Sequence, residues 1–240
     1  MPFLLLGFLL SLCCSLLSLP FVSWLVRARS VHFIGLHGSK NVCFIHTGCI
    51  QRVWIMGDSI IRRAKNRADI TGTAELGTTS TEILWLGQGG ALLRDFPHRL
   101  QSLLQTYAPP SRLIIHLGSN DIGRFEARLG REAVKSCFAA LRLALPCCHI
   151  AWSSILPRMV YRGWLKADSS QKALDGVRKS LNSFARRCMS KLENTSLILH
   201  SDIAASQSHL FLRDGVHLNT EGSDILIENF RVSLQAARYT

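Results

Sequence analysis

The chain has 240 residues and a mass of 26.7 kDa, and 48% of its residues are hydrophobic while 18% are charged. This composition fits one globular domain or at most two small ones, and it excludes a disordered, collagen-like or small disulfide-stapled chain. Lys and Arg number 28 against 16 Asp and Glu, which gives a formal charge of +12. A basic balance of this size favours contact with anionic surfaces.

The N-terminal segment is apolar. Residues 1–26 carry no charged side chain, and at about 1.5 Å per residue the run over 3–26 is just long enough to cross a hydrocarbon layer of about 30 Å. A signal peptide, a membrane anchor flanked by Arg27 and Arg29, and a leader without membrane role all stay open. The protein would then be membrane-anchored or secreted, or intracellular if the leader has no function. We expect a hydrophobic leader over 1–26, a linker over 27–50 and one domain over 51–240.

The eight cysteines show no regular framework and leave the redox compartment open. Cys43, His46 and Cys49 have the spacing of a partial metal site. His37 adds one further potential ligand, but no second ligand pair follows, so we predict no metal. Asn194 to Ser196 form a glycosylation sequon, which has meaning only in a lumenal compartment.

From residue 52 onward, short apolar runs alternate with amphipathic stretches, which is typical of an α/β domain. In chain order we expect a strand at 52–56, a helix at 60–68, a strand at 82–86, a helix at 91–107, a strand at 112–117, a helix at 125–145, a strand at 149–153, a helix through 174–188, a strand at 196–200 and a helix at 220–236. Pro109 and Pro110 end the second helix, because proline cannot continue one. From Leu174 to Cys188, apolar residues recur every three or four positions, as on one helix face.

Parallel strands need crossover connections, so this alternation predicts a three-layer α/β/α sandwich with a five-stranded parallel sheet. Ligands of such sheets bind beyond the carboxyl ends of the strands. Unusual polar residues gather at that edge in four motifs: Gly57-Asp58-Ser59, Gly87-Gln88-Gly89-Gly90, Gly118-Ser119-Asn120-Asp121 and Asp214-Gly215-Val216-His217.

In these four motifs, and in their order, the chain resembles the SGNH hydrolases, also called the GDSL esterase and lipase superfamily. The resemblance spans roughly residues 53–222. The wider neighbourhood, including Ala151 to Arg158 and Asp214 to Asn219, looks closest to the SGNH-like open reading frames of animal mobile elements. The resemblance implies a flavodoxin-like α/β fold of the SGNH hydrolase type over 51–240, and a serine esterase without a cofactor.

The resemblance also implies a role for each motif residue. Ser59 is the expected nucleophile, His217 its general base, and Asp214 the carboxylate that orients His217. The expected oxyanion hole combines the backbone N–H groups of Ser59 and Gly87 with the side chain of Asn120. This chemistry is coherent, because a serine hydroxyl is a poor nucleophile until a neighbouring base takes its proton.

Structural interpretations stay open beside these roles. Ser59 alone is typical of a helix N-cap, and Asp214 and Asn120 are typical of turns. We expect Asp58 and Asp121 to hold the motif loops rather than to react. The irregular stretch 156–167, with Arg158 and Tyr161, is expected to form part of the substrate pocket and hints at an anionic or sugar-like substrate.

Two functional hypotheses follow. The first is an acyl hydrolase that cleaves an ester or acetyl group of a small molecule, glycan or lipid through an acyl-enzyme intermediate, with possible membrane association through residues 3–26. The alternative is a catalytically degenerate SGNH-like module that binds nucleic acid or anionic lipid, through the same crevice or through basic helix faces near 62–67 and 172–191.

Overall fold

The computed structural model describes residues 51–161 and 170–236. Five strands and five α-helices lie in these residues: β1 (Gln51–Gly57), α2 (Ser59–Thr71), β2 (Thr81–Gly87), α3 (Phe96–Thr106), β3 (Arg112–His116), α4 (Ala127–Ala144), β4 (His149–Ser153), α5 (Gln171–Met189), β5 (Thr195–Ile198) and α6 (Thr220–Ala236). Two short 3-10 helices, η2 (Leu93–Asp95) and η3 (Ser208–Leu210), precede α3 and α6. The expected leader, the linker and the partial metal site around Cys43 fall outside the described residues.

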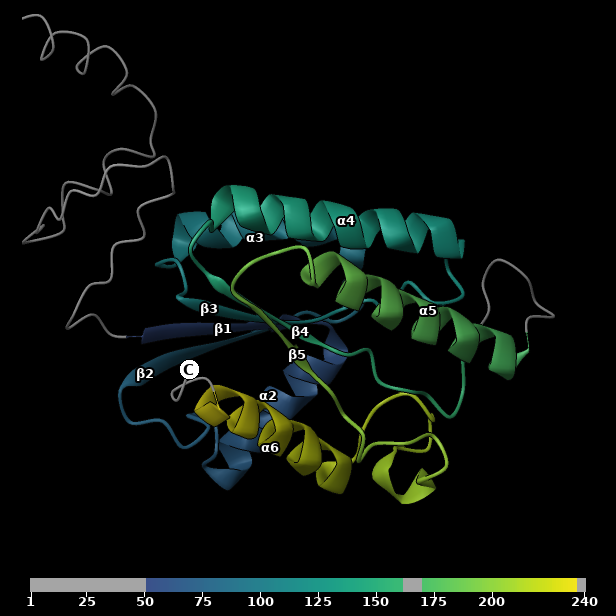
Figure 1. Cartoon of the computed structure of the whole chain (residues 1–240). Coiled ribbons are helices and arrows are strands. Elements are labelled where there is room, and N and C mark those ends of the chain that lie inside the picture. Colours follow the sequence, from purple (N-terminus) through teal and green to yellow (C-terminus); the bar gives the residue numbers. More distant parts are fainter. Residues whose placement is uncertain (1–50, 162–169, 237–240) are drawn as a thin grey trace, which may run out of the picture. The chain divides into compact units, whose positions relative to one another are not determined.

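The five strands form one parallel sheet in the order β2-β1-β3-β4-β5. Helices α3, α4 and α5 cover one face, and α2 and α6 cover the other (Figure 1). Side chains alternate along each strand, so Trp54 and Met56 pack toward α3, α4 and α5 while Val53 and Ile55 pack toward α2 and α6. This arrangement confirms the predicted three-layer α/β/α sandwich.

Several predicted boundaries were wrong by two residues or more, and two of them have a clear physical cause. The helix expected from residue 91 begins at Phe96, because Pro97 in its first turn lacks the N–H that an earlier start would need, and η2 takes up the preceding residues. The strand expected at 196–200 is β5, whose pairing with β4 ends at Ile198. His200 lies just past that end and is buried.

Helix α5 carries the amphipathic pattern that the sequence predicted. The Ser170 side chain accepts a hydrogen bond from the Ala173 N–H and caps its start. Leu174 and Leu181 are buried in the core, and Val177 packs against it.

Within residues 51–161 and 170–236, none of the helices is both long enough and apolar enough to cross a membrane.

Helix α2 packs very closely on the first two strands. An added Cβ at Gly87 would lie 2.2 Å from the Arg62 backbone nitrogen, and one at Gly57 would lie 2.1 Å from Ile61 Cγ1. Both positions therefore need glycine for the helix to reach the sheet. The helix ends at Gly72, which has a left-handed conformation with a φ of 69°.

At the amino ends of the strands, Arg142 of α4 connects the segments that lead into β4 and β5. Its guanidinium donates to the Cys148 carbonyl at 2.8 Å and to the Asn194 carbonyl at 3.2 Å, which joins the approaches to β4 and β5. Cys148 is buried, whereas its neighbour Cys147 is exposed. This edge is opposite to the one at which the four polar motifs lie.

Candidate active site

Ser59 is the first residue of α2, directly after β1. The preceding Asp58 is fully buried and caps the helix, because its Oδ1 accepts a hydrogen bond from the Ile60 N–H at 2.9 Å. The capping role weighed for Ser59 thus belongs to Asp58. The Ser59 side chain is instead directed to His217, with 2.9 Å between Ser59 Oγ and His217 Nε2.

The loop before α6 brings Asp214 against the other side of the His217 ring. Asp214 Oδ2 lies 2.7 Å from His217 Nδ1, and Asp214 Oδ1 accepts the Val216 and His217 backbone N–H groups at 2.9 Å each. Partial burial raises the pKa of Asp214, but these hydrogen bonds outweigh it and lower that pKa to about 2. An ionised carboxylate only accepts, so His217 Nδ1 carries a proton, and in the neutral ring that a general base requires Nε2 accepts from Ser59.

The loop after β3 places Asn120 in a defined orientation. Its Nδ2 donates to the Ala91 carbonyl at 3.2 Å, and its Oδ1 accepts from Arg158 Nη2 at 3.3 Å. The next residue, Asp121, is buried and accepts the Leu93 N–H at 3.1 Å, so it holds the loop against η2 as expected. Burial raises the pKa of Asp121 to about 6.

Ser119 joins this loop to α2. Its hydroxyl donates to Asp58 Oδ2 at 2.8 Å, and its Oγ accepts from Arg158 Nη2 at 2.7 Å. Burial raises the pKa of Asp58, against the lowering effect of the bonds from Ile60 and Ser119. The expectation that Asp58 holds the motif loops is confirmed by these contacts.

Gly87 occupies a different setting from the other motif residues. It is the last residue of β2, opposite Gly57, and its Cα lies against the Arg62 backbone. This packing accounts for glycine at the position without any part in an oxyanion hole. The turn after it is exposed over Gln88, Gly89 and Gly90.

The sequence did not predict that Arg99 contacts the carboxyl ends of the strands. Its Nη1 donates to the Gly57 carbonyl at 3.0 Å and its Nη2 donates to the Leu86 carbonyl, so it satisfies backbone acceptors where β1 and β2 end. Burial lowers the pKa of Arg99, against the raising effect of Asp58. No local pattern in the sequence indicates this contact, because the residues lie far apart along the chain.

A buried polar chain at the carboxyl ends of β3, β4 and β5 was also missed. His116 Nδ1 lies 2.8 Å from Ser153 Oγ, and Ser153 Oγ lies 2.7 Å from His200 Nε2. Asn229 Nδ2 donates to His200 Nδ1 at 3.1 Å, so Nε2 of the neutral ring donates to Ser153 and Ser153 donates to His116. Burial lowers the pKa of His116 to about 4 and that of His200 to about 3.

Two cavities lie at this edge. One of about 290 Å³ lies between the segment after β4, the residues after β5, and Asp175, Arg178 and Lys179 of α5. The other, of about 340 Å³, is bounded by residues after β2, by α3 and by Leu117. Neither has Ser59 among its lining residues, and the Ser59 side chain is half-buried at the surface.

Candidate metal ligands do not cluster in the part of the chain that the structure describes. In residues 51–161 and 170–236, no group of three or more His, Cys, Asp and Glu side chains has the arrangement of a metal site. Asp58 and Asp121 use their oxygens to accept hydrogen bonds from Ile60, Ser119 and Leu93.

Comparison of sequences finds neither a matching family model nor a matching curated protein. Comparison of structures finds clear similarity to a GDSL-like lipase from Bacteroides thetaiotaomicron, with a TM-score of 0.61, 19% identity, and coverage of 78% of this chain and 89% of that one. A lipase/acylhydrolase from Enterococcus faecalis gives a TM-score of 0.58 at 15% identity, with 78% and 96% covered. A carbohydrate esterase family 3 protein from Talaromyces cellulolyticus gives 0.54 at 16%, with 78% and 97% covered.

The chain therefore has the α/β fold of the GDSL and SGNH lipases and acylhydrolases. At identities of 15–19% the likeness establishes the fold. The finer resemblance to reading frames of mobile elements stays a prediction. Function has to be argued from the side chains at the site.

Proposed function

We propose that this chain is a serine acyl hydrolase of the SGNH type, which cleaves an ester or acetyl group through an acyl-enzyme intermediate. The observation that carries the proposal is the continuous chain from Ser59 Oγ through His217 to Asp214, with heavy-atom distances of 2.9 and 2.7 Å. Three residues, from the start of α2 and from the loop before α6, meet in the geometry that activates a serine. Neither helix capping nor turn formation requires the contact between Ser59 and His217.

The reaction runs in two halves. Ser59 Oγ attacks the ester carbonyl carbon while His217 Nε2 takes the hydroxyl proton, and Asp214 stabilises the imidazolium that results. The tetrahedral intermediate collapses, the bond to the leaving alcohol breaks, and His217 returns the proton to that alcohol. Water then attacks the acyl-enzyme with His217 again as the base, which releases the acid and restores Ser59.

The oxyanion of each intermediate needs donors that are already in place. The Ser59 N–H lies in the first turn of α2, where N–H groups have no partner within the helix. Asn120 Nδ2 has a second hydrogen beyond the one donated to Ala91. The sequence also assigns the Gly87 N–H to this hole; because packing accounts for that glycine, the proposal rests on Ser59 and Asn120.

The proposed substrate is an ester of a small molecule, a glycan or a lipid. Lipases, acylhydrolases and a carbohydrate esterase among the structural neighbours support this range. The His217 side chain is 21% exposed, which leaves it accessible to a substrate that approaches from the open surface. The mechanism uses side chains, a backbone N–H and water, so we propose no cofactor.

The nucleic-acid and anionic-lipid hypothesis has no specific observation in its favour. Several cations of the basic helix faces are already paired within the chain. Lys65 contacts Asp69, Arg67 contacts Asp224, and Arg178 contacts Asp175. The leader over 1–26, its membrane association through residues 3–26, and the resulting location of the protein stay predictions.

The test is labelling of the full-length chain by a fluorophosphonate probe together with turnover of p-nitrophenyl acetate. We expect Ser59→Ala to abolish both, and His217→Ala to lower both by at least about 1,000-fold, because removal of triad members costs on that order or more. Ser183→Ala, which removes an exposed α5 hydroxyl that lines neither cavity, serves as the control and should react like the wild type. Labelling that persists in Ser59→Ala, or a folded wild type that neither labels nor turns over, would overturn the proposal.

A further inference from the structure

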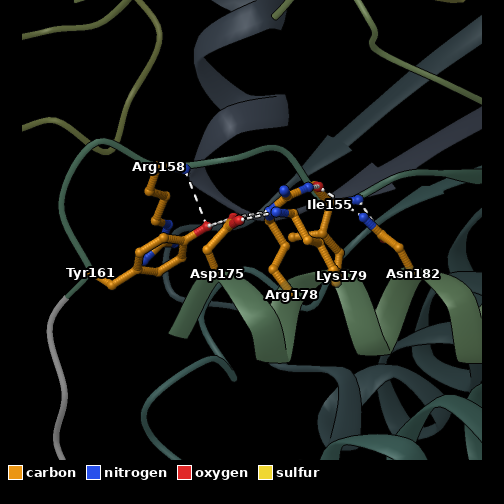
Figure 2. A network of polar contacts seen from close by, with 7 residues as sticks. All are labelled: Ile155, Arg158, Tyr161, Asp175, Arg178, Lys179 and Asn182. Atoms are coloured by element: carbon orange, nitrogen blue, oxygen red, sulfur yellow. Dashed lines mark hydrogen bonds and ion pairs between the residues drawn. The ribbon is translucent and has the colours of Figure 1, made fainter. Parts of the chain in front are cut away.

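The segment after β4, residues 154–161, is fastened to α5 at both of its ends. At one end, the Ile155 N–H donates to Asn182 Oδ1 at 2.8 Å and the Ile155 carbonyl accepts from Asn182 Nδ2 at 3.0 Å (Figure 2). At the other end, the Tyr161 hydroxyl donates to Asp175 Oδ1 at 3.1 Å. Arg178 and Lys179 fix Asp175 by ion pairs of 2.6 and 3.0 Å. The segment is thus anchored to a rigid helix.

The middle of the same segment contacts the loop of Asp214 and His217. The backbone N–H groups of Met159 and Val160 both donate to the Gly215 carbonyl, at 2.9 and 3.1 Å. Gly215 has a φ of 65°, and an added Cβ there would lie 2.8 Å from Val160 Cγ2. Contact this close sets the position of the loop that carries His217.

Arg158 extends from this segment to the loop after β3. Its backbone N–H donates to the Tyr161 hydroxyl at 3.2 Å (Figure 2), and its Nη2 donates to Ser119 Oγ and Asn120 Oδ1, at 2.7 and 3.3 Å. Ser119 passes the contact on to Asp58 at the start of α2. One side chain therefore connects, directly or through Ser119, the loops that carry Ser59 and Asn120.

The contact with Arg158 decides which way the Asn120 amide faces. A guanidinium only donates, so the atom that meets it has to be Oδ1, and a carbonyl only accepts, so the atom that meets Ala91 has to be Nδ2. A flipped amide would lose both hydrogen bonds. Without Arg158, only the contact with Ala91 would oppose rotation of the amide.

Arg158 is also costly to the fold. Its Nε is buried without a hydrogen-bond partner, and its Nη2 donates to neutral oxygens of Ser119 and Asn120. The Asp58 and Asp214 carboxylates attract its charge without a direct hydrogen bond, and burial still lowers the pKa of Arg158. Burial of a charged group without full hydrogen bonding is unfavourable. Where a fold carries such a group, a functional role is the natural explanation.

We propose that Arg158 is a positioning residue of the oxyanion hole, which holds the Asn120 amide with Nδ2 available to the developing oxyanion. The proposal rests on the proposed function. Arg158 acts through Asn120 and does not touch the substrate. Its charge polarises the amide and strengthens Nδ2 as a donor. One guanidinium nitrogen, Nη2, carries two hydrogens and so reaches Ser119 and Asn120 together.

A double-mutant cycle on the full-length chain tests the proposal, with kcat and KM for p-nitrophenyl acetate as the readout. Removal of a donor from an oxyanion hole lowers kcat by about 100- to 1,000-fold, so we expect Asn120→Ala to fall in that range and Arg158→Met to lower kcat by about 30-fold. We expect KM to stay within about twofold of the wild type, and Arg158→Met to add less than about twofold in the Asn120→Ala background, because both act on one donor. Arg158→Lys, which keeps the charge but replaces the planar guanidinium by a compact ammonium on a flexible stem, should be intermediate.

The matched control is Arg186→Met, which removes an exposed arginine from the last turn of α5 and should leave kcat unchanged. Circular dichroism and urea unfolding establish that each variant is folded. Independent losses of kcat in the two single variants, or a rise in KM at constant kcat in Arg158→Met, would overturn the proposal. The latter result would make Arg158 a substrate-binding residue instead.

A second readout separates this proposal from the proposed function. In a chain labelled with ¹⁵N-asparagine, the Asn120 side-chain amide is identified by its loss in Asn120→Ala. We expect its two proton signals to shift and broaden in Arg158→Met, and to stay in place in Arg186→Met. A wild type that hydrolyses no ester would defeat the proposed function, yet this spectrum would still decide whether Arg158 orients Asn120. An unchanged Asn120 signal in Arg158→Met would overturn the positioning role.

Discussion

The two carboxylate oxygens of Asp214 make different contacts. Oδ1 accepts the backbone N–H groups of Val216 and His217 and so builds the turn, while Oδ2 accepts from His217 Nδ1. Asp214 therefore makes the contacts of a turn residue and also contacts the His217 ring, while its role in orienting His217 for catalysis stays a prediction. With a pKa of about 2, the carboxylate stays ionised down to pH 4.

Asp214→Asn separates these contacts. Asparagine keeps one oxygen for the turn, but an amide nitrogen facing His217 Nδ1 favours the wrong tautomer, in which Nε2 carries the proton and cannot accept from Ser59. We expect kcat to fall by about 1,000- to 10,000-fold, as in triads with this change. Urea unfolding should show a free energy of unfolding within about 1 kcal/mol of the wild type, since the turn persists. A kcat within tenfold of the wild type would show that Asp214 serves the turn alone.

The sequence predicted the candidate site residues that have a local signal and missed the contacts that have none. Ser59, Asn120 and His217 each lie in a short motif at the carboxyl ends of the strands, so motif order and position were enough to propose them as candidates. Arg158 was predicted to line the substrate pocket, and its contacts with Ser119 and Asn120 could not be read from the sequence because they join residues nearly 40 positions apart. Side-chain packing across loops decides such contacts.

Among the elements, the packing of α2 on β1 and β2 depends most strictly on glycine. Gly87→Ala would place a Cβ 2.2 Å from the Arg62 backbone nitrogen, where backbone rather than a flexible side chain has to move. We expect the free energy of unfolding to fall by about 3 kcal/mol or more, at the upper end for overpacked sites. Urea denaturation of the full-length chain measures this.

Gly176→Ala is the matched control for that substitution. Gly176 lies within α5, and a Cβ there would meet no atom within 4 Å. Alanine should therefore stabilise the chain by about 0.5 to 1 kcal/mol, because it has the higher helix propensity. Equal effects of the two alanines would contradict the close packing of α2 on the sheet.

At the element level, the alternation of strands and helices was sufficient to predict the sheet and its layers. The misplaced start of α3 has a local cause in Pro97, whose missing N–H the apolar pattern over 91–107 conceals. The early end of β5 has a tertiary cause, because His200 leaves the strand to join Ser153 and Asn229. Hydrophobic patterns predict the fold, whereas a local proline sets the start of α3 and polar contacts between distant residues set the end of β5.

For the molecule as a whole, the two buried histidines tie stability to pH. The pKa of His200 is about 3 in the folded chain and about 6.5 in an unfolded one. Below pH 6.5, His200 therefore binds a proton in the unfolded state and stays neutral in the folded state. The stability contributed by neutral His200 is therefore present above pH 6.5 and lost as the pH falls. Asp121, with a raised pKa of about 6, acts in the opposite direction between about pH 4 and 6.

Comparison with His200→Gln isolates the histidine from the other groups. As the pH falls from 6.5 to 4, the free energy of unfolding of the wild type should drop relative to that of the variant by up to about 1.4 kcal/mol per pH unit. Urea unfolding of both proteins at half-unit intervals measures the difference. A difference that is constant with pH would mean that His200 is protonated in the folded chain.

The residues that the structure describes, 51–161 and 170–236, form a five-stranded sheet with an apolar core on each of its faces. We therefore expect a fragment of residues 51–240 to unfold in one cooperative urea transition and to label with the fluorophosphonate probe as the full-length chain does. A broad, non-cooperative transition of the fragment would show that the first 50 residues complete the domain.

The exposed thiol of Cys147 is a site for chemical attachment at the end of the strands opposite the candidate active site. In the fragment, Cys137 and Cys148 are buried and Cys188 is half-buried, and burial raises the pKa of all three, so Cys147 is the most reactive thiol. It precedes β4 at the amino edge, whereas Ser59 follows β1 at the carboxyl edge. Molecules attached to a maleimide-coated surface would stand with Ser59 outward, as an oriented layer open to polymeric or membrane-bound esters.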